Sequence, residues 1–231
     1  MGIRNSFEIE IQQLKDELLT LGSMVEQQIL SSVEALKKRD AAASNLVIEV
    51  DQKVNAKRYS IEEQVLISIA TQQPMAHDLR LLASILEIAG ELERIGDYAK
   101  GIATINLRMG DEPLLKPLID VPRMAEKAVN MLHRSLTAFI SEDSIAAEAI
   151  PAEDDFVDDL YDQIYRELMV IIIQDARNIE RANWLLWTAH NLERMADRVT
   201  NICERTLFTA TGELKEIKST HLSRKTNGLP N

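Results

Sequence analysis

The sequence predicts an all-α fold: two tandem, sequence-related three-helix bundles built from six long antiparallel helices. The composition favours helices, because 45% of the 231 residues are hydrophobic while only 8 Gly and 6 Pro interrupt the chain. Apolar residues recur every three or four positions through most of the sequence, which is the period of an amphipathic helix. In addition, LERIGD at residues 92–97 returns as LERMAD at 192–197, which indicates an internal repeat.

The first half of the chain predicts three helices joined by two turns. They are expected over residues 9–38, 41–70 and 79–107. The polar pair Arg39 and Asp40 ends the first helical pattern, and the segment 71–80, which contains Pro74, turns the chain before the third helix. Asp78 is placed to cap that helix. The apolar stripe of the second helix is expected to consist of Leu46, Val50, Val54, Ile61, Val65 and Ile69.

The same order of elements returns after a linker. Residues 108–121, which contain Gly110 and precede Pro122, are expected to join a first repeat at 1–107 to a second repeat at 122–212. The second repeat predicts helices over 122–141, 145–174 and 179–210, with Gly212 as the stop signal. The tail at 213–231 is polar, and we expect it to be disordered.

Charge and cysteine content limit the possible classes of function. The formal net charge of −11 argues against nucleic-acid binding, because contact with a phosphate backbone relies on clustered Lys and Arg. Cys203 is the single cysteine, so no internal disulfide can form, and its helical phase predicts a buried thiol. No apolar run approaches the ~18 residues that indicate a membrane span. We therefore expect a cytoplasmic protein that is peripheral to the membrane at most.

The repeated motif carries two carboxylates, and they occupy the same positions on the helix in both repeats. On a helical wheel, Glu93 and Asp97 flank the apolar stripe one turn apart, and Glu193 and Asp197 repeat this arrangement. Carboxylates at this spacing repel each other by roughly a few tenths of a kcal/mol unless a cation lies between them. The stripes match between the repeats, with Ile85, Ile88, Leu92, Ile95, Ala99 and Ile102 in the first and Leu185, Thr188, Leu192, Met195, Val199 and Ile202 in the second.

The middle helix of each repeat offers a second pair of polar side chains. Asp51 and Asn55 lie there in the first repeat, and Asp154 and Asp158 in the second. Antiparallel packing can bring each pair beside the pair on the third helix, which would form two mostly carboxylate patches suited to a hard or borderline metal. Asn55 lowers the charge of the first patch, so its site is expected to be the weaker one. The alternative is a solvated acidic face that binds no metal.

The sequence offers little for catalysis. None of the four histidines follows a glutamate by three residues, so the Glu-x-x-His pairs of a carboxylate di-iron oxidase are missing. Gly-rich phosphate loops and G-x-S-x-G are missing as well. The main rival of a metal-binding regulator is therefore a metal-free helical adaptor or scaffold with a different partner. Asp78 and Arg80 either contact a partner or brace their helix, and Trp187 lies off the stripe and is a candidate for partner contact.

Five further segments carry a family resemblance. They are TLGSMVEQQI at 20–29, QPMAHDLR at 73–80, ELERIGDYA at 91–99, AEDDFVDDLY at 152–161 and NLERMADRVTNICE at 191–204. In this order they are similar to recurrent segments of the PhoU family, the accessory and regulatory proteins of the phosphate-specific transport system. The resemblance runs from about Phe7 to Gly212. It implies two symmetric three-helix bundles and a non-enzymatic protein that restrains phosphate uptake and the phosphate-starvation response.

The resemblance also implies cofactors and partners. PhoU-like proteins can hold multinuclear iron or zinc clusters on E(D)-x-x-x-D motifs, and the matching residues here are Asp51, Glu93, Asp97, Asp154, Asp158, Glu193 and Asp197. The implied partners are the ATPase of the phosphate ABC transporter and a phosphate-sensor histidine kinase, and a homodimer is expected. Two departures fall in the first repeat. Lys100 and Gly101 stand where the second repeat has Thr200 and Asn201, and Asn55 stands where the second repeat has an acid.

Overall fold

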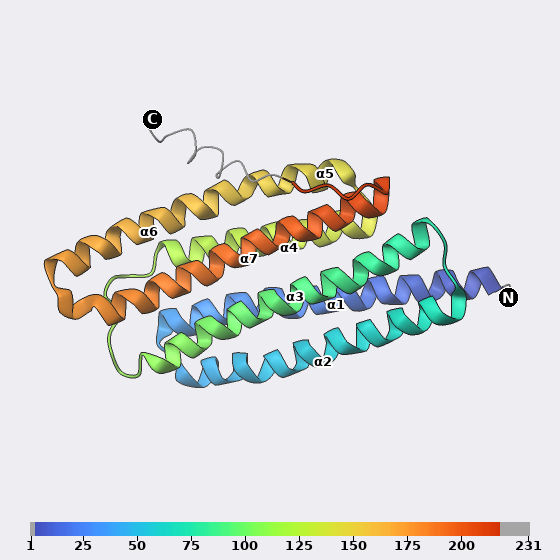
Figure 1. Cartoon of the computed structure of the whole chain (residues 1–231). Coiled ribbons are helices and arrows are strands. Elements are labelled where there is room, and N and C mark those ends of the chain that lie inside the picture. The colour runs from blue at the N-terminus through green and yellow to red at the C-terminus, as the bar shows by residue number, and fades with distance from the viewer. Residues whose placement is uncertain (1–2, 218–231) are drawn as a thin grey trace, which may run out of the picture.

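The computed structural model describes residues 3–217, with side chains from residue 6 onward, as long helices joined by short turns (Figure 1). The first repeat contains α1 (Ile3–Lys38), α2 (Ala41–Gln72) and α3 (His77–Arg108). The second contains α4 (Asp120–Ser141), α5 (Ser144–Ala149), the 3-10 turn η1 (Ile150–Glu153), α6 (Asp154–Gln174), the 3-10 turn η2 (Ala176–Asn178) and α7 (Ile179–Thr211). Within residues 3–217 there is no strand, and none of the helices is long and apolar enough to cross a membrane. The predicted all-α class is confirmed.

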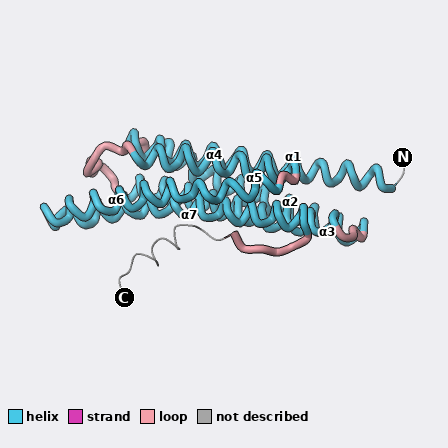
Figure 2. The backbone as a smooth tube through the Cα atoms, turned by 90° about the horizontal axis from the view of Figure 1, so that it is seen from above, coloured by secondary structure: helices cyan, strands magenta, loops and turns pink. Residues whose placement is uncertain are grey.

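The two repeats form bundles that lie side by side along their length (Figures 1 and 2). α2 packs against α1 and α3, and α6 packs against α4 and α7, which places α2 and α6 at the two outer edges. α3 and α7, the helices that carry the repeated motif, pack extensively against each other, and α1 packs on α4. The apolar side chains of both bundles consequently merge into one core.

α3 and α7 bury the stripe that the sequence predicts. All twelve predicted stripe residues of these two helices are at most 1% exposed. Cys203 is also fully buried, as its helical phase predicts, and this burial raises the pKa of its thiol to about 12. Because the thiolate is the reactive form of cysteine, Cys203 is an inert core group.

The stripe predicted for α2 is wrong at its first residue. Leu46 is 60% exposed, whereas Val47 and Asp51 are each only 3% exposed. Val54, Ile61 and Val65 are buried as predicted, and Val50 and Ile69 are partly buried against the core. A helix has 3.6 residues per turn, so its buried face drifts away from a strict pattern of threes and fours, and here the drift brings Asp51 to the core side. This predicted ligand is therefore buried and does not lie on an exposed face.

The single helix predicted over residues 145–174 is interrupted. Asp143 caps α5 by accepting a backbone N–H at 3.0 Å, and the turn η1 follows with Pro151 near its start. Because proline has no N–H and its ring clashes with the preceding turn, the α-helix cannot continue through Pro151. α6 begins at Asp154, so this residue lies in the first turn of a helix, whereas Asp51 lies inside α2.

Two other helix starts differ from the predicted ones. α4 begins at Asp120, inside the predicted linker, and Pro122 is tolerated in its first turn because an N–H there has no helical partner. α3 begins at His77, and Ala76, with a φ of 49°, occupies its N-cap position. Asp78 is therefore not the cap that the sequence predicts. It lies within the first turn, where its negative charge is favourable to the helix dipole.

The described chain after α7 contacts the second bundle at its last residue, Ile217. Gly212 ends α7 in the left-handed conformation with a φ of 81°, as predicted. The backbone N–H of Ile217 donates to Glu204 Oε1 at 2.8 Å, and the Ile217 side chain packs against the core. Ile217 is thus in contact with the bundle, residues 213–216 are exposed, and the remainder of the tail predicted to be disordered lies outside the described residues.

A buried amide joins the end of α3 to the turn between α1 and α2. Asn106 is 4% exposed, and its Nδ2 donates to Ser44 Oγ at 2.8 Å and to the Ala35 carbonyl at 3.1 Å. Arg39 reaches the same place and donates to the Asn106 carbonyl at 3.3 Å and to the Gly110 carbonyl at 2.7 Å. These bonds satisfy polar groups at the two helix ends that have no partner within their own helix.

Replacing Asn106 with Ala is expected to lower the free energy of unfolding by about 1–3 kcal/mol, because the substitution removes buried hydrogen bonds and leaves their acceptors without donors. Urea denaturation followed by circular dichroism measures the change. Asn130→Ala is the matched control, since Asn130 is exposed on α4, and its effect should stay below about 0.5 kcal/mol. Equal losses in the two variants would show that this network does not stabilise the helix ends.

Candidate functional site

The first cluster consists of Asp51, Asn55, Glu93 and Asp97, and the packing of α2 on α3 brings its two helices together. Asp51 and Asp97 both accept hydrogen bonds from Lys100 Nζ, at 2.8 and 2.9 Å. Asn55 also donates to Asp51, at 3.3 Å. An ammonium group thus lies between the carboxylates of two helices. Lys100 is recognisable in the sequence as a departure from the second repeat, but its contact with Asp51 depends on helix packing.

Glu93 lies at the edge of the first cluster. Burial and the nearby charge of Asp97 raise the pKa of its carboxyl, while Arg58 lowers it. Glu93 is therefore within electrostatic range of a carboxylate on its own helix and of a guanidinium on α2. The first cluster holds three carboxylates, and Lys100 and Arg58 compensate their charge.

The second cluster consists of Asp154, Asp158, Glu193 and Asp197, which are the equivalent positions on α6 and α7. Asp154 is 5% exposed. Burial, and then the charges of Asp158, Asp197 and Glu193, raise the pKa of Asp154 to about 8. Its buried Oδ1 accepts no hydrogen bond from any described residue. The second cluster therefore contains all four predicted residues, and its most buried member, Asp154, has a carboxyl oxygen without a hydrogen-bond donor in the described part of the chain.

Asp197 lies on the more open side of the second cluster. Burial raises the pKa of Asp197, while Arg194 and Arg198 lower it, and Arg194 Nη1 lies 3.2 Å from Asp197 Oδ2. His190 adjoins the cluster, with its Nδ1 3.3 Å from Glu193 Oε2.

The second cluster has the donor chemistry for a cation, and the first would have it only if Lys100 moved away. Carboxylate oxygens are the ligands that hard and borderline metals accept, and a buried Asp154 oxygen without a donor would gain from a positive ion. Among residues 3–217, however, no three His, Cys, Asp or Glu side chains lie close enough together to hold an ion as they stand. Side chains of the second cluster must rotate toward an ion for it to bind.

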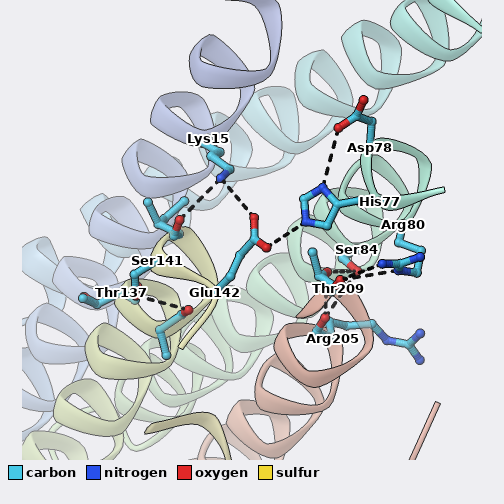
Figure 3. A network of polar contacts seen from close by, with 12 residues as sticks. Lys15, His77, Asp78, Arg80, Ser84, Thr137, Ser141, Glu142, Arg205 and Thr209 are labelled. Carbon is cyan, nitrogen blue, oxygen red and sulfur yellow. Dashed lines mark hydrogen bonds and ion pairs between the residues drawn. The ribbon is translucent and has the colours of Figure 1, made fainter. Parts of the chain in front are cut away.

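Asp78 and Arg80 lie where the two bundles meet (Figure 3). Arg80 Nη2 donates to the Thr209 carbonyl at 3.3 Å, at the end of α7. His77 Nε2 lies 2.7 Å from Glu142 Oε2, and His77 Nδ1 lies 3.6 Å from Asp78 Oδ1. Arg80 therefore braces α3 against α7, and Asp78 belongs to a polar network that links α3 to the end of α4.

Trp187 lies on the surface of α7 beside the second cluster. Its side chain is 53% exposed, and its ring lies 5.8 Å from the ring of His190. Tyr161 of α6 lies 6.2 Å from the same imidazole. A half-exposed tryptophan in an aromatic group is a frequent anchor of protein interfaces, so Trp187 stays a candidate for partner contact.

Sequence reasoning missed the polar contact at the centre of the molecule. Glu91 of α3 is 9% exposed and accepts hydrogen bonds from Asn201 at 3.0 Å and from Arg198 at 3.4 Å, both on α7. At the equivalent place in the first repeat stands Gly101, where an added Cβ would lie 3.0 Å from Asn191 Nδ2. The glycine permits this close approach of α7. The available signal was the change from Asn201 to Gly101 between the repeats.

The fold and the site define a two-repeat helical protein with one acidic cluster per repeat. The family model described as "PhoU domain" matches this chain twice, over residues 18–105 and 121–206. The chain belongs to the PhoU family.

Known relatives cover nearly the whole chain. The "Phosphate-specific transport system accessory protein PhoU homolog" of Aquifex aeolicus is 34% identical over 216 residues, which are 94% of this chain and 97% of that protein. The corresponding Escherichia coli protein is 35% identical over 211 residues, 91% of this chain and 88% of its own. Crystal structures of PhoU from Streptococcus pneumoniae and Pseudomonas aeruginosa superpose with TM-scores of 0.83 and 0.84, each at 30% identity and over 90% of this chain and 99% and 100% of theirs.

Replacing Asp154 with Asn is expected to stabilise the metal-free protein at high pH. The Asp154 carboxyl has a pKa of about 8 in the folded protein against an ordinary value of 3.8, so only the folded state keeps its proton between these values. The contribution of Asp154 to the stability of the wild type therefore falls as pH rises from 4 to 8. The variant should match the wild type near pH 4 and exceed it by about 5 kcal/mol at pH 8.

Urea denaturation in the presence of a chelator, at several pH values, measures this difference. Asn130→Ala is the control, because Asn130 is exposed on α4 and carries no titratable group, so the stability of this variant relative to the wild type should not change with pH. An Asp154→Asn variant that is less stable than the wild type at pH 8 would contradict a buried, proton-bearing carboxyl.

Proposed function

We propose that this protein is a non-enzymatic regulator of phosphate uptake and of phosphate-starvation signalling. The observation that carries the proposal is the duplicated PhoU domain, which covers most of the chain. The relatives that share it are named as accessory or regulatory proteins of phosphate transport. The whole described chain is taken up by two helical bundles, which supports a role through contact.

In this proposal the protein acts on the cytoplasmic side of the membrane by binding two partners. They are the ATPase of the phosphate ABC transporter and a phosphate-sensor histidine kinase, and the protein binds them as a homodimer. The net charge of −11 supports docking on basic surfaces, because complementary charge speeds encounter and orients it. The exposed ring of Trp187 offers an apolar anchor beside an acidic cluster.

The acidic clusters serve as metal sites in the same proposal, with iron or zinc as the ions. Support comes from Asp154, whose buried Oδ1 has no donor and which lies among three other carboxylates. Asp154 and Asp158 of α6 and Glu193 and Asp197 of α7 would hold the ion. Its positive charge would compensate the four carboxylates and join α6 to α7.

The double variant Glu193→Gln/Asp197→Asn is expected to lose the metal of the second cluster while it stays helical, because each substitution removes a charged oxygen ligand. Elemental mass spectrometry measures the metal content of protein purified without chelator and then offered iron, zinc, manganese or magnesium. Glu180→Gln is the control, since Glu180 is exposed at the start of α7 and is distant in sequence from Glu193 and Asp197. Unchanged stoichiometry in the double variant would exclude these residues as ligands, and no metal in any sample would favour the metal-free adaptor.

The immobilised full-length protein is expected to retain the transporter ATPase at micromolar concentrations. Trp187→Ala should weaken retention by roughly tenfold, the usual effect of removing an aromatic anchor from an interface. Tyr59→Ala is the matched control, because Tyr59 is 63% exposed on α2, at the opposite edge of the molecule from α6. No retention of the wild type at these concentrations would contradict regulation through this contact.

A further inference from the structure

The two acidic clusters differ in what lies between their helices. In the first cluster, Lys100 Nζ bridges Asp51 of α2 and Asp97 of α3, at 2.8 and 2.9 Å. In the second repeat the residue at the position of Lys100 is Thr200, which carries no charge. The repeats thus present nearly the same carboxylates with and without a bridging cation.

We propose that Lys100 is a built-in replacement for a metal ion. The ammonium keeps the first cluster metal-free, and the protein binds its metal only at the second cluster, between α6 and α7. This inference rests on the metal-binding part of the proposed function and restricts it to one of the two repeats.

The contacts of Asp51 leave no room for a metal. Asp51 is 3% exposed, and both of its oxygens already accept hydrogen bonds. Oδ2 accepts from Lys100 at 2.8 Å and from Asn55 at 3.3 Å, and Oδ1 accepts from Gln28 of α1 at 3.5 Å. An incoming cation would have to displace these donors and would be repelled by the ammonium at short range. The first cluster therefore has its own positive charge, and Asp51 and Asp97 are already engaged by it.

In the second cluster the charge of the buried carboxylate is compensated differently. Asp154 is 5% exposed, and its Oδ1 accepts no hydrogen bond from residues 3–217. Arg194 contacts Asp197 at 3.2 Å, but both residues lie on α7, and Arg198 donates to Glu91 of α3. A metal ion between α6 and α7 would give Asp154 the bond that Lys100 gives Asp51.

A reciprocal exchange of the two residues tests this assignment. The full-length wild type is compared with Lys100→Thr, with Thr200→Lys and with the double exchange. Each protein is incubated with zinc chloride, or with iron(II) under anaerobic conditions, and freed of unbound metal by gel filtration before elemental mass spectrometry. Lys53→Thr is the control for loss of one positive charge, because Lys53 is exposed on α2.

The expected results are different for each protein. Lys100→Thr should gain metal and roughly double the wild-type content, since it frees the first cluster. Thr200→Lys should lose the metal of the second cluster, with zinc affinity reduced by at least about tenfold. The double exchange should move the metal to the first cluster, where Asp51→Asn/Asp97→Asn then removes it. Lys53→Thr should keep the wild-type content.

Thermal unfolding gives a second readout. Lys100→Thr leaves Asp51 buried without its ammonium, so this variant should be less stable than the wild type without metal and should recover with zinc. If Lys100→Thr does not fold, Thr200→Lys decides alone, because retained metal there overturns the assignment.

The remaining outcomes distinguish a failure of this inference from a failure of the proposed metal binding. Wild-type metal that disappears in Asp51→Asn/Asp97→Asn would show an ion in the first cluster despite Lys100, which overturns the inference and leaves metal binding intact. A folded Lys100→Thr that gains no metal also overturns it. No metal in any of the proteins overturns both the inference and the metal-binding part of the proposed function.

Discussion

The structure depends on the packing of α3 against α7. Their apolar stripes, at most 1% exposed, face into a core that both repeats share. Glu91 adds a polar contact between the two helices, with donors from Asn201 and Arg198. Because α3 and α7 carry the same motif, both repeats present an equivalent apolar stripe to the shared core. Two small bundles thereby bury more apolar surface together than each would alone.

The same packing determines where the acidic clusters lie. With the stripes facing the shared core, the carboxylates that flank them meet the outer helices α2 and α6. Asp51 and Asp154 are the buried members of the two clusters, at 3% and 5% exposure, and so each needs a hydrogen-bond donor, a cation or a proton. Lys100 meets this need in the first repeat. In the second repeat, burial and the neighbouring carboxylates raise the pKa of Asp154 to about 8, so a proton compensates its charge in the metal-free protein.

The differences between prediction and structure have separate physical causes. Helical period predicts which residues share a face, but a small drift over several turns moved the buried face of α2 from Leu46 to Val47. Pro151 is visible in the sequence as a helix breaker, yet the surrounding periodicity is strong enough to conceal the break. Asp78 has the chemistry of a cap, but the chain enters α3 through Ala76, whose φ is positive, and the helix begins at His77.

The sequence by itself determined the all-α class, the duplication, the stripes of α3 and α7 and the carboxylates of both clusters. These features follow from local periodicity and from a repeat that can be read directly. Only the tertiary structure decided how the carboxylates are compensated. Lys100 and Asp51 are 49 residues apart in the chain and meet because α2 packs on α3, and Asp154 is buried because α6 begins there and lies against α7. Charge compensation at short range depends on distances between helices, which no local pattern encodes.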